Sequence, residues 1–446
     1  MISSATGGLD RASCGRVRLG SLALALTPLW LSLSATGCYL SHERARDDAG
    51  RAPDDAGVAV RRDAAPRDAG HDAGTDAGDD AGHDAGADAG LPPCTPETFE
   101  EPPTGPPVAV DLLFVVDSSG SMSEEQRTLA ENFPRMLEML LTGDMDRDGV
   151  RDFFPVASLH VGVVTTDLGD DGFGVCGDAR PPEGDDAVLR TSGSFALTGC
   201  APPYPSVLSF RPEDGVPPSA FAHDFSCVAR VGTQGCGYEQ PLEAALKALT
   251  PGTSPLRFAH DSIGHGDGAN AGFLRDDATL AIVLVTDEDD CSVSDPDLYD
   301  PESTVYTDTT NMRCTRYEDL ALHAVRRYVD GLHALRASDP ENMVLAAIAG
   351  VPEDLTADPD HIDYDRILSD PRMVVRENPG RPGHLLPACD VVGRGFAVPA
   401  RRVVEVTRGF GEQGVVQSIC QDGFAGALRG ITSRLARVIR RTRCVE

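Results

Sequence analysis

The chain has 446 residues, of which 41% are hydrophobic, so it is long enough for one large domain or two ordinary domains with tails. Its formal net charge is −31, from 70 acidic and 39 basic residues. Such a charge disfavours binding to nucleic acid and to anionic membranes, and it favours divalent cations. Most of the acidic excess lies in residues 95–446, outside the N-terminal segments.

The N-terminal segment has the pattern of a secretion signal. Arginines between positions 11 and 18 precede the apolar run 19–33, which is too short and too interrupted for a membrane span. Small residues at 35–37 stand directly before Cys38, and this pattern resembles the lipobox of bacterial lipoproteins. The resemblance implies a signal peptide at 1–37, lipidation of Cys38 and a lipid-anchored place in the bacterial cell envelope, periplasmic or at the cell surface. A plain secreted protein is the alternative.

Residues 38–94 are predicted to be a disordered tether. From Asp68 the unit Asp-Ala-Gly-x repeats, so glycine recurs at every fourth residue and repelling aspartates leave nothing to pack. A calcium-binding repeat is the alternative, but the known β-helix repeat needs two adjacent glycines and a regular apolar position.

The cysteines indicate an oxidising compartment. Of the 12 cysteines, Cys14 and Cys38 lie in the N-terminal segment, and an even number remains between Cys94 and Cys444. Because no C-x-x-C pair suggests zinc or redox chemistry, disulfides are expected. Free buried thiols in a cytosolic protein are the alternative.

From Val108 onward, apolar β-rich runs alternate with helical patterns. The predicted strands are 110–116, 159–165, 280–286, 343–349 and 415–419. The predicted helices are 124–141, 239–249, 318–336, 400–410 and 425–440. This alternation predicts an α/β domain over residues 95–446, with a doubly wound, mostly parallel sheet that binds ligands beyond the carboxyl ends of its strands.

Two inserts, at about 168–230 and 352–398, interrupt the alternation. Both are rich in Gly, Pro and Asp, and both contain cysteine. Neither is large enough to form a substantial core alone, so disulfides are expected to attach them to the sheet. The aromatic residues of the first insert either shape a partner surface or pack against the sheet: Phe173, Phe195, Tyr204, Phe210, Phe221 and Phe225.

The first predicted strand runs directly into Asp117, Ser119 and Ser121, in the spacing D-x-S-x-S. Alternate residues of a tight loop can turn one carboxylate and two hydroxyls toward a common point, and such oxygen ligands suit Mg²⁺ or Ca²⁺. A hydrolase nucleophile elbow or a phosphate loop fits less well, because the glycine pattern of each is absent and Lys247 is the chain's sole lysine. A serine-rich helix-capping turn without metal is the alternative.

Two later positions complete a larger pattern. Thr233 stands in the loop "GTQG" before a predicted helix, and Asp287 ends a predicted strand in "VLVTDEDD". With the D-x-S-x-S turn, this layout resembles the von Willebrand factor type A (VWA) domain over about residues 108–444. The resemblance implies a metal-ion-dependent adhesion site of Asp117, Ser119, Ser121, Thr233 and Asp287. It also implies that the hydroxyls bind Mg²⁺ or Ca²⁺ directly, while the aspartates often act through water.

The sequence departs from that family at two places. Glu288, Asp289 and Asp290 follow Asp287 where the family usually has glycine. These acids either add negative charge near the cation, favouring calcium or a second site, or form a solvated loop rim. Cys227 and Cys236 lie on either side of Thr233, and a local disulfide between them would stiffen its loop.

A second candidate site follows the helix predicted at 124–141. The spacing D-x-D-x-D-G-x-x-D resembles the start of an EF-hand calcium loop and supplies Asp144, Asp146, Asp148, the Val150 carbonyl and Asp152. Pro155 occupies the position of the bidentate glutamate, so one ligand is missing. The loop is therefore expected to hold a structural Ca²⁺, with a plain acidic turn as the alternative.

These patterns predict a binding module rather than an enzyme. The family resemblance implies an open coordination position that takes a carboxylate from a protein, a peptide or a surface polymer. A structural envelope scaffold or secretion-accessory protein, in which metal only stabilises the fold, is the first alternative. A hydrolase that combines Ser119 or Ser121 with His160 or His223 is a minor one, because no motif links these residues.

Overall fold

The structure is a computed structural model that describes residues 108–177, 180–194, 197–392, 395–421 and 423–444. The predicted signal peptide, Cys38, the tether, Cys94 and Phe195 lie outside these residues. All described residues belong to one compact unit.

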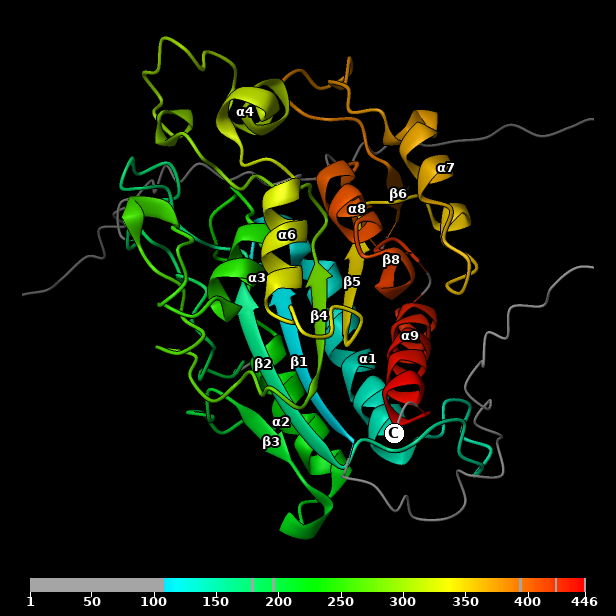
Figure 1. The fold of residues 1–446 in the computed structure, drawn as a ribbon. Coiled ribbons are helices and arrows are strands. Elements are labelled where there is room, and N and C mark those ends of the chain that lie inside the picture. The colour runs from blue at the N-terminus through cyan, green and yellow to red at the C-terminus, as the bar shows by residue number, and fades with distance from the viewer. Residues whose placement is uncertain (1–107, 178–179, 195–196, 393–394, 422, 445–446) are drawn as a thin grey trace, which may run out of the picture. The chain divides into compact units, whose positions relative to one another are not determined.

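A six-stranded mixed sheet forms the centre of the α/β fold (Figure 1). In spatial order its strands are β3 (Leu208–Phe210), β2 (Ser158–Thr165), β1 (Ala109–Val116), β4 (Thr279–Val285), β5 (Met343–Ala349) and β8 (Gly414–Ser418). Five of them run parallel, while the edge strand β3 pairs antiparallel with β2. The five predicted strands are confirmed within about a residue; β3 lies inside the first insert and has no counterpart in the prediction.

Helices cover both faces of the sheet (Figure 1). One face packs against α1 (Ser123–Thr142), α2 (Pro218–Ala229) and α9 (Ala425–Cys444). The other packs against α3 (Pro241–Leu249), α6 (Arg326–Ala334) and α8 (Arg401–Arg408). Alternate residues of β1 serve the two faces, so that Phe114 points into the first core and Leu113 into the second. This explains why the strands read as continuous apolar runs.

The helix predicted at 318–336 is the clearest difference from the sequence pattern. The chain instead forms α5 (Glu318–Ala321) and then α6, separated by a short extended segment. In that segment Leu322 forms an isolated bridge with Val293, and the His323 N–H donates to the Ser292 carbonyl. These tertiary hydrogen bonds replace the helical ones and end the first helix.

The first insert contributes α2, which the sequence reading does not predict. The helix starts with proline at its first turn and buries Phe221 and Phe225. The Phe225 ring lies 4.8 Å from that of Phe114 on β1 and 5.2 Å from that of Phe133 on α1, measured between centroids. The insert therefore packs against the sheet through most of its aromatic side chains, although Phe173 stays partly exposed.

Four disulfides occur among the described residues, namely Cys176–Cys236, Cys200–Cys227, Cys291–Cys314 and Cys389–Cys420. The first attaches the first insert to the loop of Thr233, and the last attaches the second insert to the segment after β8. The local Cys227–Cys236 disulfide that the sequence left open does not form. Cys227 lies on the buried face of α2 and pairs within the insert, which leaves Cys236 for Cys176.

Smaller elements lie in the connections. They are α4 (Thr310–Arg316), α7 (Tyr364–Ser369) and a two-stranded antiparallel sheet of β6 (Cys389–Val391) and β7 (Gly395–Ala397). Segments after β2, before α3 and after β4 share a third apolar cluster around Tyr238, Leu298 and Tyr299. Among the described helices, none has the length and apolarity needed to cross a bilayer.

The order of the strands defines where a ligand site is expected. From β1 the chain moves to β2 on one side, and it later returns to β4 on the other side of β1. The carboxyl ends of β1 and β4 therefore flank the point at which the strand order reverses, which is the usual ligand position in open α/β sheets. The Asp117 N–H donates to the Val285 carbonyl at 2.9 Å and holds these two ends together.

Candidate metal centre

The turn after β1 fixes the carboxylate of Asp117 from two sides. The Ser119 N–H donates to Asp117 Oδ1 at 2.7 Å, and the Thr286 hydroxyl donates to Asp117 Oδ2 at 2.8 Å. Thr286 stands at the end of β4, so the side chain of Asp117 is shared between the two central strands. A short 3₁₀ turn, Gly120–Met122, then leads into α1.

A chain of hydroxyls connects this turn to Asp287. Ser119 Oγ lies 3.0 Å from Ser121 Oγ, and Ser121 Oγ donates to Asp287 Oδ1 at 3.1 Å. Asp117, Ser119 and Asp287 are buried, while Ser121 is partly exposed. Four of the five predicted ligand residues are thus brought together, with Ser121 on the solvent side.

The loop that carries the fifth predicted ligand, Thr233, is fastened on both sides of that residue. Gln126 of α1 donates from Nε2 to the carbonyls of Asp117 and Gly232, both at 2.7 Å, and its Oε1 accepts from the Gly232 N–H at 3.0 Å. Two residues after Thr233, the Gly235 N–H donates to the Ser118 carbonyl at 2.7 Å. The contact is so close that a Cβ at position 235 would lie 2.1 Å from Ser118 Oγ, so only glycine fits.

Gln126 is a positioning residue that the sequence reading misses. Its one local signal is an amide on a helix face whose other buried members include Leu129, Ala130 and Phe133. A buried amide needs hydrogen-bond partners, but the sequence does not show that one of them lies more than a hundred residues away.

The electrostatics of the centre are those of buried carboxylates close to one another. Burial raises the pKa of Asp117 to about 6, against the hydrogen bonds from Ser119 and Thr286, which lower it. Burial, followed by the negative charges of Asp117 and Glu288, raises the pKa of Asp287 well above its usual range. Among the described residues, no lysine or arginine forms an ion pair with Asp117 or Asp287. No described basic side chain therefore compensates their charge.

This donor set fits a hard divalent cation. Carboxylate and hydroxyl oxygens are the ligands preferred by Mg²⁺ and Ca²⁺, whereas zinc and copper sites use Cys or His. A buried carboxylate without a counter-charge is costly, and a cation between Asp117 and Asp287 would remove that cost. Asp117, Ser119, Ser121 and Asp287 would hold the ion, and Thr233 lies in the loop anchored beside them.

The acids after Asp287 have individual roles. Asp290 is buried and forms an ion pair with Arg402 at 3.2 Å, and it accepts a hydrogen bond from the Leu242 N–H at the start of α3. Asp289 accepts from the Arg402 N–H at 3.0 Å at the start of α8. The solvated-rim alternative is therefore wrong for these two residues, because both fix helix N-termini. Glu288 is half-buried and lines a cavity.

The second predicted site lies in the loop between α1 and β2. Carboxylate oxygens of Asp144, Asp146 and Asp152 lie within 4.8 Å of one another. Asp148 is outside this group and instead accepts a hydrogen bond from the Val150 N–H. The loop therefore gathers three of the four predicted carboxylates, and Asp144 is already oriented by the N–H groups of Arg147 and Gly149.

The histidines of the hydrolase alternative lie on β2 and α2. His160 stands opposite Asp111 in the β1–β2 register, and its Nδ1 lies 3.1 Å from the Phe273 carbonyl. Asp111 precedes Asp117 by six residues of β1, which corresponds to about 20 Å of extended strand. His160 therefore cannot act as a base toward Ser119 or Ser121. The His223 ring contacts Cys227 in the first insert.

Comparisons with known proteins add little. No protein-family model matches the chain, and no curated protein matches it. One match among solved structures is proximal thread matrix protein 1 from the mussel byssus, at 13% identity and a TM-score of 0.23. It covers 55% of this chain and 38% of that chain, and a likeness at this level carries no argument about fold or function.

Proposed function

We propose that the chain is a bacterial cell-envelope lipoprotein whose VWA-like domain binds Mg²⁺ or Ca²⁺ and uses the ion to recognise a carboxylate on a partner protein, peptide or surface polymer. The observation that carries this proposal is the continuous connection from Ser119 through Ser121 to Asp287. It joins the carboxyl ends of β1 and β4 where the strand order reverses.

The chemistry of the ligands supports binding rather than catalysis. Asp117 and Asp287 supply two negative charges, while Ser119, Ser121 and Thr233 supply neutral hydroxyls. A divalent cation held by this set offers an electrophilic coordination position, which an acidic side chain of a partner can fill without bond making. Ser121 is partly exposed and marks the side from which a partner reaches the ion.

The remaining residues of the centre position these ligands. Thr286 orients Asp117, and Gln126 attaches the Thr233 loop to the end of β1. The Cys176–Cys236 disulfide attaches the other side of that loop to the first insert. The loop is thus held in one place before any partner arrives, which reduces the ordering cost of binding.

The proposal is tested with the full-length protein as bait for bacterial envelope extracts, in Mg²⁺ and in EDTA. We expect a captured partner to be released by EDTA and to be absent with Asp117→Ala, while the exposed control Asp214→Ala retains it. Retention of the same partner both in EDTA and by Asp117→Ala contradicts the proposal. If metal raises only the melting temperature and leaves partner binding unchanged, the scaffold alternative is favoured.

We further propose that the loop of Asp144, Asp146 and Asp152 holds a structural Ca²⁺. The mutual approach of the three carboxylates supports this assignment, as does Gly149, whose positive φ of 88° permits the sharp turn. The ion would order the connection from α1 to β2 and has no role in partner recognition.

A further inference from the structure

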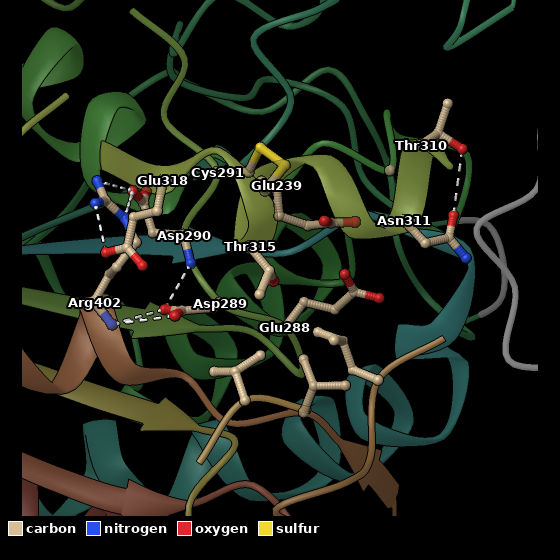
Figure 2. A pocket seen from close by; sticks show the side chains of 15 residues that line it. Glu239, Glu288, Asp289, Asp290, Cys291, Thr310, Asn311, Thr315, Glu318 and Arg402 are labelled. Carbon is tan, nitrogen blue, oxygen red and sulfur yellow. Dashed lines mark hydrogen bonds and ion pairs between the residues drawn. A yellow bond between two sulfur atoms is a disulfide. The ribbon is translucent and has the colours of Figure 1, made fainter. Parts of the chain in front are cut away.

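A cavity of about 50 Å³ adjoins the candidate metal centre (Figure 2). Its walls come from Glu239 before α3, from the segment after β4 and from α4. Two contacts place it beside the centre: Glu288, one of its walls, directly follows Asp287, and Val398, another wall, donates its N–H to the Asp287 carbonyl at 3.0 Å.

Two carboxylates point into this cavity. Figure 2 shows the side chains of Glu239 and Glu288 directed into the same space, with Thr315 and Asn311 nearby. Glu239 is only 2% exposed, and its Oε1 has no hydrogen-bond partner among the described residues. The carboxylate of Glu239 therefore presents a buried hydrogen-bond acceptor to the cavity, and no described residue donates to it.

The other charged residues of the cavity are already engaged. Arg402 bonds to Asp290 and to the His323 carbonyl, and its N–H donates to Asp289. The guanidinium of Arg402 is thus committed to Asp290, to Glu318 and to the His323 carbonyl. A cation that satisfies Glu239 has to come from outside the described residues.

The size and ligand geometry favour an ammonium group over a second metal ion. About 10–15 Å³ of solvent-accessible volume is enough for one water molecule, so a cavity of about 50 Å³ accommodates an ammonium group together with the end of its side chain. Among the described residues, Glu239 and Glu288 do not belong to any group of three acidic, His or Cys ligands within 4.8 Å of one another. An ammonium group needs only hydrogen-bond acceptors on two or three sides, which carboxylates and a hydroxyl supply.

We propose that this cavity receives the side-chain ammonium of a lysine that stands close to the metal-binding acid of the partner. The inference rests on the proposed function, because the partner's carboxylate on the ion would bring the lysine to the cavity. The partner motif is therefore an acid with a neighbouring lysine, and Glu239 is the residue that selects for the lysine.

The test uses a series of short capped peptides in a glycine–serine background. Each peptide has one aspartate and one lysine, and the position of the lysine relative to the aspartate shifts by one residue from peptide to peptide. In a matched set, norleucine replaces lysine and so keeps the length of the side chain without its charge. With the full-length protein in Mg²⁺, we expect at least one lysine peptide to bind roughly tenfold tighter than its norleucine counterpart, or about 1.4 kcal/mol. Glu239→Gln should abolish that difference, and the exposed control Glu213→Gln should keep it.

The outcomes separate this inference from the proposed function. Metal-dependent binding that is equal for lysine and norleucine peptides overturns the lysine cavity and leaves the metal site standing. A loss of one bound Mg²⁺ or Ca²⁺ per chain in Glu239→Gln, measured by equilibrium dialysis, assigns the cavity to a metal and also overturns it. Absence of metal-dependent binding by every aspartate peptide contradicts the proposed function itself. If Glu239→Gln fails to fold, Glu288→Gln on the more exposed wall replaces it, with the same expected loss of lysine preference.

Discussion

Gln126 and Gly232 hold each other through a reciprocal pair of hydrogen bonds. The amide nitrogen of Gln126 donates to the Gly232 carbonyl at 2.7 Å, and the Gly232 N–H donates back to the amide oxygen at 3.0 Å. The side-chain amide of Gln126 thus pairs with the backbone of Gly232 as a strand residue would, and this pairing attaches the Thr233 loop to α1. Because the same nitrogen also donates to the Asp117 carbonyl, one side chain couples two parts of the candidate centre.

Gln126→Met tests this coupling, since methionine keeps the length and removes the hydrogen bonds. Three backbone groups lose their partner, and we expect the free energy of unfolding to fall by roughly 2–4 kcal/mol. The apparent affinity for Mg²⁺ should also fall, because Thr233 is no longer held beside Asp117. Urea unfolding and calorimetric Mg²⁺ titration measure the two effects. Arg127→Met on the exposed side of the same helix is the control, and an equal Mg²⁺ affinity in both variants would argue against the coupling.

Asp287→Asn should change stability in opposite directions with and without metal. In EDTA the variant should be more stable than the wild type, because a buried, repelled carboxylate becomes a neutral amide that still accepts from Ser121. With Mg²⁺ at 100 times its Kd the wild type should gain about 2.7 kcal/mol and the variant far less. Thermal melts in both buffers check this. If the wild type is more stable than the variant in EDTA, the carboxylate of Asp287 is not destabilised by burial and by the neighbouring negative charges.

The sequence predicts the framework of the centre because its signals are local. The D-x-S-x-S motif directly follows a buried strand, so its place at the carboxyl end of that strand can be read from the sequence. In a parallel sheet the carboxyl ends of neighbouring strands lie at the same edge. Ser121 meets Asp287 because β1 and β4 are neighbours in the sheet. The hydrophobic periodicity predicts the fold class, but it does not give the order of the strands. Gln126 and Glu239 are outside the prediction, because their significance depends on partners that are remote in sequence.

Two questions that the sequence left open are decided by the same physical cause. Asp289 and Asp290 read as loop acids, yet the starts of α8 and α3 need acceptors for their free N–H groups, and these two carboxylates supply them. Cys236 reads as a neighbour of Cys227, yet Cys227 faces the apolar core from α2 and meets Cys200 there. In both cases tertiary packing decides the partner, and sequence proximity does not.

The two disulfides of the first insert should separate stability from recognition. Cys176–Cys236 closes a sequence separation of 60 residues and Cys200–Cys227 one of 27, so the loss of either should cost about 3–4 kcal/mol in the chain-entropy account. Only Cys176→Ser/Cys236→Ser frees the Thr233 loop, and we expect this variant alone to weaken Mg²⁺ binding. Calorimetric titration measures the Mg²⁺ affinity of both double variants. Equal affinities would mean that the Cys176–Cys236 disulfide does not contribute to metal binding.

The calcium loop makes a ranking prediction. Because Asp146 and Asp152 belong to the group of close carboxylates and Asp148 does not, Asp146→Asn and Asp152→Asn should each weaken Ca²⁺ binding more than Asp148→Asn. Calorimetric titration in excess Mg²⁺, which occupies the other site, measures the difference. Unchanged Ca²⁺ stoichiometry in all three variants would reduce the loop to an acidic turn.

Glu125, in the first turn of α1, should make the metal-free protein less stable as the pH rises. The side chain is buried, and burial raises its pKa to about 7, helped by the charges of Glu124 and Asp117. A pKa that is higher in the folded state than the ordinary 4.5 means that the folded protein binds the proton more tightly. Its stabilising contribution is therefore complete below about pH 4.5 and is lost as the pH rises through 7.

Glu125→Gln removes this titration and fixes the neutral form. In EDTA at pH 8, we expect the variant to exceed the wild type in free energy of unfolding by about 3 kcal/mol, and by less than about 1 kcal/mol at pH 5. Urea unfolding at both pH values gives the comparison. Glu131→Gln, at an exposed position on the same helix, is the control. A Glu125→Gln gain that is the same at pH 5 and pH 8 would mean that amide packing, and not the buried charge, accounts for it.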